Sequence, residues 1–519
     1  MSPADVEADI CMIGAGAAGC FLAHAISRSG LRTIIVEAGG RTTASAAEIG
    51  LESAFAHAVY SGATEGRFFG LGGTTAHWGG LLAPHGDRDL GGGDTQGAAW
   101  QHIVDTVGAE SRQVLETLGY RGGDDFAERA GAIGDDMVQT LREAGIATLA
   151  ALHLPFRRKN LRGLLDTAMK APTAPHLVTD ATVIGWEHVD VKSCTIKGIR
   201  VRASDGSEAV IRARRFVVAA GALESARLLL ELRDGQAGAL IPATALIGQG
   251  LSDHLSLPIA DVAERDRALA ARMFGPRFDG AWMRTFRLMA GGTPRSFAHF
   301  TFAMEGAGFQ LARKALQALQ RRSWPAIGTG EASRAAADLT RIAWARFARQ
   351  RLHLPPGAPV HLQLDIEQAP TATNQLGFGE RRDILGRRIP IIDWRISDDD
   401  LAQAERTAAR YLQCWQAAGP SLPVLLPRLL STATAKPHDA YHPAGLTRLG
   451  ADPAAVVDFG LKVHGLDNLF LVSTGVLPSP GTANPTFTML CLANRLARTL
   501  ADAKDAPMGD DDQAAKGES

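Results

Sequence analysis

The sequence predicts an α/β protein built on a Rossmann-like dinucleotide-binding unit, and three observations support this. Over residues 9–37, a glycine-rich turn joins an apolar strand to a helix. A second strand that ends in glycine and leads into a helix follows at residues 215–231. Between these units, residues 177–214 alternate with a period of two, which is typical of strands.

The glycine turn near the N-terminus is the strongest local motif. The pattern G-x-G-x-x-G falls at Gly14, Gly16 and Gly19, directly after an apolar strand. These glycines permit a tight turn, the close approach of a pyrophosphate, and close packing of the next helix on the strand. We expect that helix through residues 21–26, with a stop at Gly30. Its free N–H groups would face the phosphates.

Glu37 directly follows a second predicted strand at residues 33–36. It lies 18 residues beyond Gly19 (37 minus 19). At this distance a carboxylate accepts hydrogen bonds from an adenosine ribose. The same carboxylate disfavours NADP, because it would repel the 2′-phosphate. The unit alone does not distinguish NAD from FAD.

Length and composition describe an ordinary globular protein of two or more domains. The chain has 519 residues, of which 46% are hydrophobic and 21% are charged. A formal net charge of −1 gives no electrostatic basis for nucleic-acid binding. The five scattered cysteines form no C-x-x-C pair, so we expect reduced thiols. No secretory or membrane-spanning segment is expected, and the predicted location is cytoplasmic.

A second glycine-rich run spans residues 70–80 and contains His77 and Trp78. So many glycines let backbone approach a large planar ligand. The simpler alternative is a hydrogen-bonded loop histidine beside a packing tryptophan.

The middle of the chain predicts helices followed by strands. Helices are expected at 98–151 and 156–171, and the basic cluster at 157–159 is interpreted as a solvated face. The expected strands are residues 177–180, 181–189, 194–203 and 209–214. Residues 247–257 are expected to form a glycine-rich connection that ends in Asp253 and His254.

Residues 261–430 differ in character and form the candidate substrate domain. Strands are expected at 361–366 and 389–396, and a helix at 400–418 follows the cap Ser397. Residues 334–352, which begin with Arg334 and end with Leu352, predict a basic amphipathic helix. Contact with a membrane or partner is one interpretation of it, and a solvent-facing helix docked on the core is the other.

The C-terminal stretch completes a set of motifs. His442-Pro-Ala-Gly445 and ANPTFT at 483–488 follow GAGAAG, LGGTTAHWGG, RFVVAAGALESARLLL and GQGLSDH along the chain. Together they resemble the glucose–methanol–choline (GMC) oxidoreductases, and most closely the branch with pyranose oxidase and the fructose and gluconate dehydrogenases. One departure is Leu446, where the family usually has threonine.

The resemblance implies FAD and a GMC / p-hydroxybenzoate-hydroxylase-like two-domain architecture. It implies a discontinuous Rossmann-like FAD-binding domain and an α+β substrate domain with an antiparallel sheet. The expected FAD-binding segments are 1–90, 172–258 and 436–505, and the substrate segments are 91–171 and 259–435. A polar, acidic tail at 506–519 is expected to be disordered.

The resemblance also implies a catalytic pair. His442 falls on the family's active-site histidine, and Asn484 falls where members carry His or Asn. Oxidation of an alcohol removes an O–H proton, which an imidazole can accept, and a hydride, which flavin N5 accepts. Asn484 would donate a hydrogen bond to the same oxygen. His438 and His442 are spaced like zinc ligands, but Pro437 and Pro443 argue against a helix there, so no metal is predicted.

The cofactor contacts expected from the glycine motif and the resemblance together span the chain. They are Gly14, Gly16, Ala18, Gly19, Glu37, Ala38, Gly72, Gly73, Thr74, His77, Trp78, Gly79, Val183, Ala220, Gly221, Gly475, Val476, Asn484, Pro485 and Thr486. His77 aligns with the histidine that carries the flavin covalently in pyranose oxidase. We expect non-covalent stacking at His77, with a covalent link as the alternative.

The predicted function is therefore oxidation of a C–OH group of a sugar, glycoside or other bulky alcohol to a carbonyl. The phenylalanines at residues 274–302 favour a bulky, partly apolar substrate, unless they are simply core. Oxygen, a quinone or a redox protein would reoxidise the flavin. Two alternatives are non-alcohol chemistry on this fold, such as light-driven decarboxylation, and a flavin-binding protein without catalysis. The intact His442 and Asn484 argue against the second.

Overall fold

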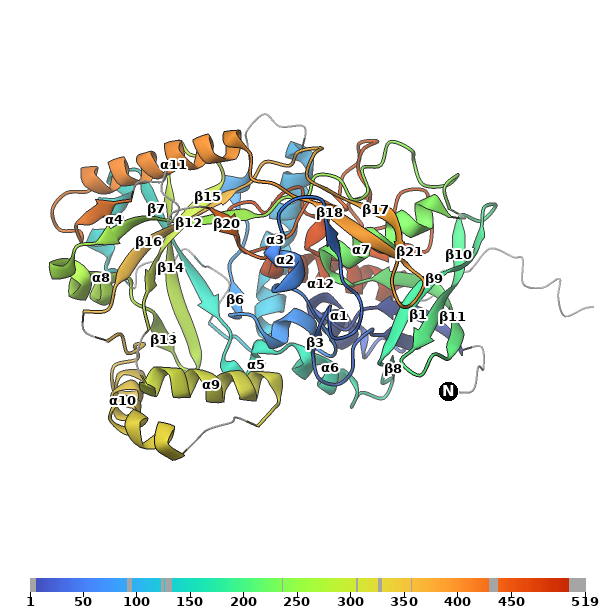
Figure 1. Ribbon diagram of the computed structural model, residues 1–519, viewed down its shortest axis with the longest axis horizontal. Helices are drawn as coiled ribbons and strands as arrows, with labels where there is room; N and C mark the ends of the chain where they lie inside the picture. The colour runs from blue at the N-terminus through green and yellow to red at the C-terminus, as the bar shows by residue number, and fades with distance from the viewer. Residues whose placement is uncertain are drawn as a thin grey trace, which may run out of the picture.

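The computed structural model describes residues 6–90, 96–122, 126, 133–235, 237–304, 307–324, 329–355, 357–428 and 437–503. The predicted tail at 506–519 lies outside these residues. Two large sheets organise the molecule and occupy its two halves (Figure 1). The predicted α/β class, with an antiparallel sheet beside a Rossmann-like unit, is confirmed.

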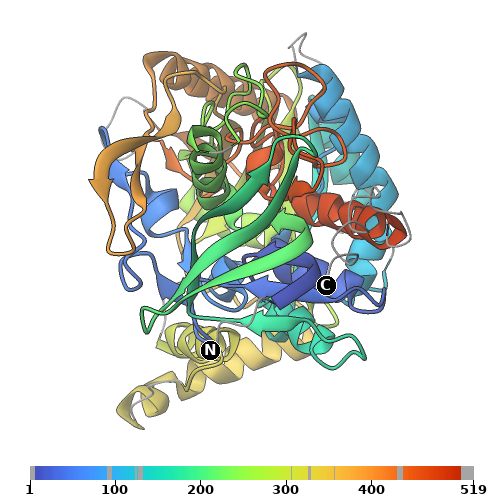
Figure 2. The ribbon, with the colours of Figure 1, turned by 90° about the vertical axis from the view of Figure 1, so that its right-hand side faces the viewer.

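The first sheet has seven strands in the order β8-β2-β1-β11-β10-β9, with β21 also paired to β11. Strands β8, β2, β1, β11 and β21 run parallel, whereas β10 and β9 are antiparallel. Figure 2 looks at the end of the molecule where β9, β10 and β11 lie. The bounds are β1 (Val6–Ile13), β2 (Thr33–Val36), β8 (His176–Val178), β9 (Ala181–Asp190), β10 (Thr195–Ala203), β11 (Glu208–Val218) and β21 (Leu469–Leu471). The parallel part thus joins strands from both ends of the chain.

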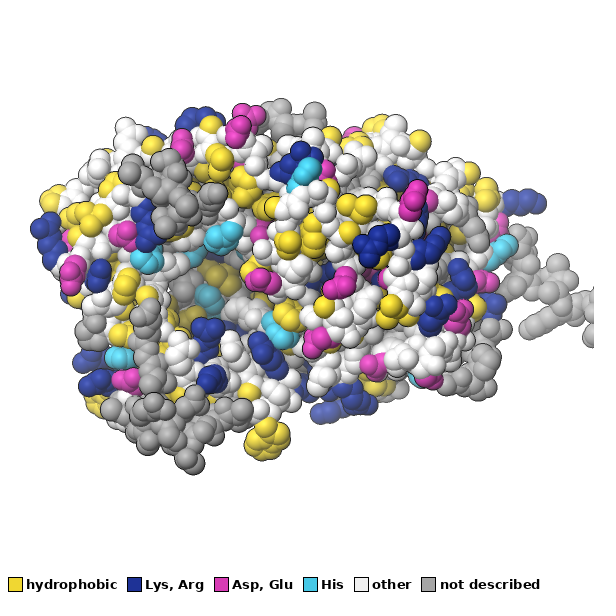
Figure 3. Space-filling view, in the orientation of Figure 1, with side chains coloured by type: hydrophobic (Ala, Val, Ile, Leu, Met, Phe, Trp, Pro, Cys, Tyr) yellow, Lys and Arg dark blue, Asp and Glu magenta, His cyan; other side chains and the backbone are white. Residues whose placement is uncertain are grey.

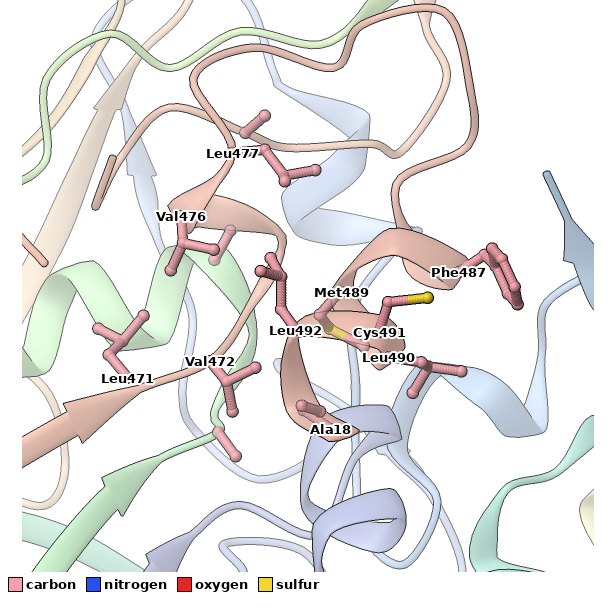
Figure 4. Packing of buried hydrophobic residues seen from close by; sticks show 14 of the residues in the cluster. Ala18, Leu471, Val472, Val476, Leu477, Phe487, Met489, Leu490, Cys491 and Leu492 are labelled. Carbon is pink, nitrogen blue, oxygen red and sulfur yellow. The ribbon is translucent and has the colours of Figure 1, made fainter. Parts of the chain in front are cut away.

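Helices pack around this sheet and bring the two ends of the chain together. Figure 4 shows Ala18 of α1 against the side chains of the first turns of α12. The helices of this half are α1 (Ala17–Ile26), α2 (Ser61–Thr64), α3 (Gly97–Thr117), α6 (Arg162–Ala168), α7 (Gly221–Asp234) and α12 (Thr486–Asp502). The predicted stop of α1 at Gly30 is too late, because Ser27 already caps it and Gly30, with φ +80°, turns the chain toward β2.

The second sheet has nine strands, and every described pairing in it is antiparallel. Helix α11 (Asp398–Ala417) lies over it, and its cap Ser397 accepts the N–H of Asp400 at 3.1 Å, as predicted. The strands are β6 (Leu81–Leu82), β7 (Ile146–His153), β12 (His254–Val262), β13 (Arg277–Asp279), β14 (Trp282–Ala290), β15 (Ser296–Phe302), β16 (Val360–Glu367), β19 (Leu425–Pro427) and β20 (His438–Asp439).

Several local predictions are wrong where pairing or burial overrides the sequence pattern. The helix expected up to residue 151 ends earlier: α4 (Asp135–Glu143) is followed by β7, which pairs with β14 along its length. The helix expected at 156–171 is split into α5 (Phe156–Lys159) and α6, because the backbone at Asn160 is extended. Residues 254–257 belong to β12 and not to a connection.

The basic cluster at 157–159 is only partly solvated. Lys159 is buried, and burial lowers its pKa to about 8. Its ammonium lies 4.3 Å from the centre of the Phe156 ring. The prediction of a solvated face is therefore wrong for Lys159.

The remaining elements are a helical hairpin and small sheets. α9 (Ala307–Arg321) and α10 (Thr329–Ala348) lie beside the second sheet (Figure 1), so the predicted helix is confirmed up to residue 348. None of the described helices is both long and apolar enough to cross a membrane. The others are α8 (Arg267–Phe274), a sheet of β17 (Gln375–Arg382), β18 (Arg388–Asp393) and β4 (Ala54–Phe55), and the pair β3 (Ala44–Ser45) and β5 (Phe68–Phe69).

The two sheets follow the predicted segments closely but not completely. The first sheet takes all its strands from 1–90, 172–258 and 436–505. The second contains β6, the start of β12 and β20 from those same segments. The division into two domains at these boundaries remains a prediction.

Candidate active site

A cavity lies at the carboxyl ends of β1, β2, β11 and β21. Strand ends line it at Gly14, Glu37, Ala220 and Val472. Ligands of open α/β sheets bind in this crevice, because neighbouring loops and helix N-termini converge there. The cavity therefore lies where the sequence predicts the dinucleotide.

The glycine turn has the geometry that the motif requires. Gly14 has φ +106°, and a Cβ there would lie 2.6 Å from the Ala219 carbonyl oxygen. A Cβ on Gly19 would lie 2.0 Å from the Gly14 oxygen, so this glycine allows α1 to pack on the turn. A Cβ on Gly16 would meet nothing within 4 Å, so its backbone faces open space. The residues present fit a pyrophosphate at the N-terminus of α1.

Glu37 is buried at the end of β2 and lines the same cavity. Its carboxylate accepts the backbone N–H groups of Ala15 at 2.7 Å, Gly39 at 3.0 Å and Gly70 at 2.8 Å. Burial raises the pKa of Glu37, although these N–H groups oppose the shift. The carboxylate is thus held rigidly in the cavity wall.

The structure brings most, but not all, of the predicted cofactor residues to this cavity. Those that line it are Gly14, Gly16, Ala18, Glu37, Ala38, Gly73, Thr74, Trp78, Val183, Ala220, Gly221 and Thr486. Those outside its lining are Gly19, Gly72, His77, Gly79, Gly475, Val476, Asn484 and Pro485.

His77 is engaged elsewhere. Its ring stacks on Phe68 with 3.6 Å between ring centres, and its Nε2 lies 2.8 Å from the Thr43 hydroxyl. Burial lowers the pKa of His77 to about 4. Non-covalent flavin stacking at His77 remains a prediction, with a covalent link as the alternative. The neighbouring Trp78 does line the cavity, and its indole donates to the Lys159 carbonyl at 2.7 Å.

The cavity wall also holds an ion cluster that the sequence analysis missed. Glu224 lies 2.5 Å from Arg227, 3.0 Å from Arg387 and 3.6 Å from Arg67. Burial raises the pKa of Glu224, but the three guanidinium groups outweigh it and lower the pKa to about 2. Because Arg67 and Arg387 come from distant segments, no local pattern could have joined them.

A second cavity lies on the second sheet. Figure 3 shows a hollow on this face with histidine side chains in its wall. Much of the lining is aromatic. Its polar side chains include Arg287 on β14, His299 on β15 and Asp365 on β16. The lining includes Phe274, Phe286, Phe297, Phe300, Arg287, His299, Asp365, His153, His442 and Asn484.

The predicted pair His442 and Asn484 meets in this second cavity. The Asn484 Nδ2 lies 2.8 Å from the His442 Nε2. Pro443 and Thr486, which are close neighbours of the pair in sequence, line the first cavity. The pair therefore stands where the two cavities approach each other. Burial lowers the pKa of His442 to about 3, so its ring is neutral.

His254, the last residue of the GQGLSDH motif, contacts the pair. Its Nδ1 lies 3.0 Å from the His442 Nδ1. The preceding Asp253 accepts the backbone N–H groups of His442 at 2.9 Å and His254 at 2.7 Å, and the hydroxyl of Tyr60. Burial raises the pKa of Asp253 to about 7. These bonds join the start of β12 to the His442 loop.

Arg287 on β14 is the other neighbour that the sequence analysis missed. It is 3% exposed and donates from Nη2 to the Asn484 Oδ1. Its guanidinium lies 3.7 Å from the centre of the Phe297 ring, and burial lowers its pKa to about 10. Across the same lining, the His299 Nδ1 lies 3.2 Å from Asp365.

Comparison with known proteins places this site in a family. A family model described as GMC oxidoreductase matches residues 370–493. The chain is 24% identical to 6'''-hydroxyparomomycin C oxidase of Streptomyces lividus over 96% of this chain and 92% of that protein. It is 25% identical to pyridoxine 4-oxidase of Microbacterium luteolum over 92% and 96% of the two chains. The fold is similar to the crystal structure of pyridoxine 4-oxidase from Mesorbium loti, with a TM-score of 0.57, 17% identity, and coverage of 95% and 98%.

Over residues 370–493, which include His442 and Asn484, the chain matches the GMC oxidoreductase family model, in agreement with its motifs. It is an oxidoreductase that acts on CH–OH groups, and its cofactor is FAD.

Proposed function

We propose that the protein oxidises a C–OH group of a bulky alcohol to a carbonyl, with His442 as the base and Asn484 as its hydrogen-bonding partner. The observation that supports this most is the neutral, partly buried His442 at 2.8 Å from Asn484, placed between the dinucleotide cavity and the aromatic cavity. An oxidant on one side and an alcohol on the other would meet at this pair.

The residues divide the work of removing a proton and a hydride. The glycine turn, Glu37 and Thr486 would hold FAD in the first cavity. FAD, when bound, supplies the hydride acceptor. The His442 Nε2 would accept the hydroxyl proton, and the Asn484 amide would donate to the oxygen as its negative charge develops. Arg287 would add positive charge beside that amide.

The second cavity supports a substrate with both apolar and polar surfaces. Phenylalanine rings offer apolar contact, while Asp365, His299 and Arg287 can bind hydroxyl groups. A sugar or glycoside has this character. The relatives named for oxidation of 6'''-hydroxyparomomycin C and pyridoxine also support an alcohol substrate. Reoxidation by oxygen, a quinone or a redox protein, and a cytoplasmic location, remain predictions.

Anaerobic mixing of the FAD-loaded protein with a panel of sugars, glycosides and other alcohols tests this function. We expect at least one of them to bleach the visible absorbance of the flavin in the dark. If none does, while dithionite still reduces the bound flavin, the proposal is wrong. Turnover that requires light would instead favour the alternative of light-driven chemistry.

A further inference from the structure

We propose that His254 and Arg287 are positioning residues that fix the proton arrangement of the catalytic pair. They are the inner members of a hydrogen-bonded chain that runs from the Gly481 carbonyl through His254, His442 and Asn484 to Arg287. This hydrogen-bonded chain leaves the lone pair of His442 on Nε2, where it accepts the Asn484 amide N–H. The catalytic consequence rests on the proposed function of His442.

The first fixed end is the Gly481 carbonyl, which lies 2.8 Å from the His254 Nε2. A carbonyl oxygen only accepts, so the His254 Nε2 carries a hydrogen. His254 is completely buried, and burial lowers its pKa to about 4, so its ring is neutral. A neutral imidazole with its hydrogen on Nε2 has a lone pair on Nδ1.

That lone pair decides the tautomer of His442. The Nδ1 atoms of the two rings are 3.0 Å apart, and their ring planes are at 86°. Two lone pairs would repel each other at this distance, so the His442 Nδ1 must carry a hydrogen and donate it. Because His442 is also neutral, its Nε2 is left unprotonated.

The second fixed end leads to the same result independently. A guanidinium group only donates, so Arg287 must face the oxygen of the Asn484 amide. The amide nitrogen then faces the His442 Nε2 at 2.8 Å. An N–H donor there requires an acceptor, so Nε2 carries the lone pair. The opposite tautomer would place two hydrogens against each other at Asn484 and two lone pairs against each other at His254.

The surroundings hold this chain in place. Asp253 binds the backbone N–H groups of both histidines, so their rings keep their relative position. Arg287 is buried and stacked on Phe297, whose ring also forms a T-shaped pair with the His254 ring. When His442 takes the hydroxyl proton on Nε2, the Asn484 N–H turns from Nε2 to the substrate oxygen. The Nδ1–H bond of His442 to His254 is kept, so the charged ring retains an acceptor.

Nitrogen-15 NMR of the FAD-loaded protein, labelled at histidine, tests the arrangement directly. Two-bond nitrogen–proton correlations distinguish the two neutral tautomers, and the His442 resonances are those absent from His442→Asn. We expect His442 with its hydrogen on Nδ1 and His254 with its hydrogen on Nε2. The opposite tautomer at either ring would overturn the proposal.

Substitutions test the consequence. His254→Phe keeps a ring but removes both nitrogens, and we expect flavin reduction to slow on the order of 10–100-fold while the Kd for the substrate changes less than about threefold. His254→Asn places an amide oxygen where Nδ1 stood, and should recover at least part of the lost rate. His464→Phe is the matched control, because His464 also bonds a carbonyl, that of Gly450 at 3.0 Å, outside both cavities.

These outcomes separate the proposal from the function on which it rests. If His254→Phe retains FAD and its flavin is reduced at a rate within about twofold of the parent rate, His254 is not a positioning residue. A mixture of His442 tautomers in His254→Phe would support the proposal even if another residue proved to be the base. Full activity of His442→Asn would refute the base assignment, and the tautomers measured in the parent protein would still stand or fall separately.

Discussion

At His442, burial does what a high pH would do in water, because it keeps the imidazole unprotonated. The titratable groups around the ring act on its pKa in opposite directions. Asp365 favours the charged ring, while Arg287, His254 and His85 disfavour it, and burial dominates. The result is a base that is ready without prior deprotonation.

The pH dependence of flavin reduction follows from this. Since the folded pKa of His442 is lowered from 6.5 to about 3, the ring stays neutral as the pH falls from about 8 to about 5. We expect no acid limb from His442 in this range, measured as the reduction rate at saturating substrate. Burial raises the pKa of both Asp253 and Glu367 to about 7, so either group can produce a limb, and Asp253→Asn and Glu367→Gln are measured in parallel. A limb centred near 6.5 that persists in both variants would contradict the assignment.

We expect the affinity of the protein for FAD to depend on the Glu37 side chain. Glu37→Gln turns one acceptor oxygen into a donor that faces backbone N–H groups of Ala15, Gly39 or Gly70. We expect FAD to bind at least about 10-fold more weakly, because lost buried hydrogen bonds cost about 1–3 kcal/mol. The FAD content after dialysis and the Kd for FAD measure this. The exposed Glu52→Gln is the control, and equal affinity of both variants would refute the role of Glu37.

At the scale of elements, sequence patterns correctly predicted the helices and strands whose structure is determined by residues close to one another in sequence. β1, α1 and β2 follow from the glycine motif and apolar runs, and β9, β10 and β11 follow from their alternation. β7 was missed because its identity as a strand depends on β14, which lies more than 100 residues away in sequence. The split between α5 and α6 depends on Asn160. Its side-chain amide donates a hydrogen bond to the backbone carbonyl of Gln320 in α9.

Helix α7 should depend on its buried cluster. Glu224→Gln leaves Arg227, Arg387 and Arg67 buried with less negative charge, so we expect the free energy of unfolding to fall by about 3–5 kcal/mol. Because the folded pKa of Glu224 is lowered from 4.5 to about 2, its stabilisation is complete above pH 4.5 and is lost as the pH falls toward 2.

Denaturant unfolding at neutral pH and at progressively lower pH measures both effects. Glu208→Gln is a suitable control, because Glu208, at the start of β11, pairs with the partly exposed Arg202 of β10. Equal stability of the parent and Glu224→Gln at neutral pH would contradict the importance of the cluster.

At the scale of the whole molecule, the site joins segments that only the fold brings together. The resemblance supplied His442 and Asn484, and the structure places them 2.8 Å apart. It included His254 in the GQGLSDH motif without giving it a role, and it did not supply Arg287, which lies 197 residues from Asn484 in sequence. The contacts of His254 and Arg287 with the pair depend on strand register, which no motif in the sequence predicts.

Removal of FAD should destabilise the whole molecule, because the first cavity is lined by segments from Ile13 to Met489. A ligand that binds only the folded state stabilises it by about 2.7 kcal/mol at 100 times its Kd. We expect the Tm to fall by several degrees when FAD is removed and to recover when it is added back. An unchanged Tm would show that FAD does not bridge these segments.

The central claim is that His442 is the base in alcohol oxidation, and the rate of anaerobic flavin reduction tests it most directly. His442→Ala and the control His464→Ala are loaded with FAD and mixed with the alcohol that reduces the parent protein fastest. We predict that His442→Ala loses on the order of 10²–10⁴-fold in rate with FAD still bound, while His464→Ala keeps the parent rate. A parent-like rate in His442→Ala would contradict the account.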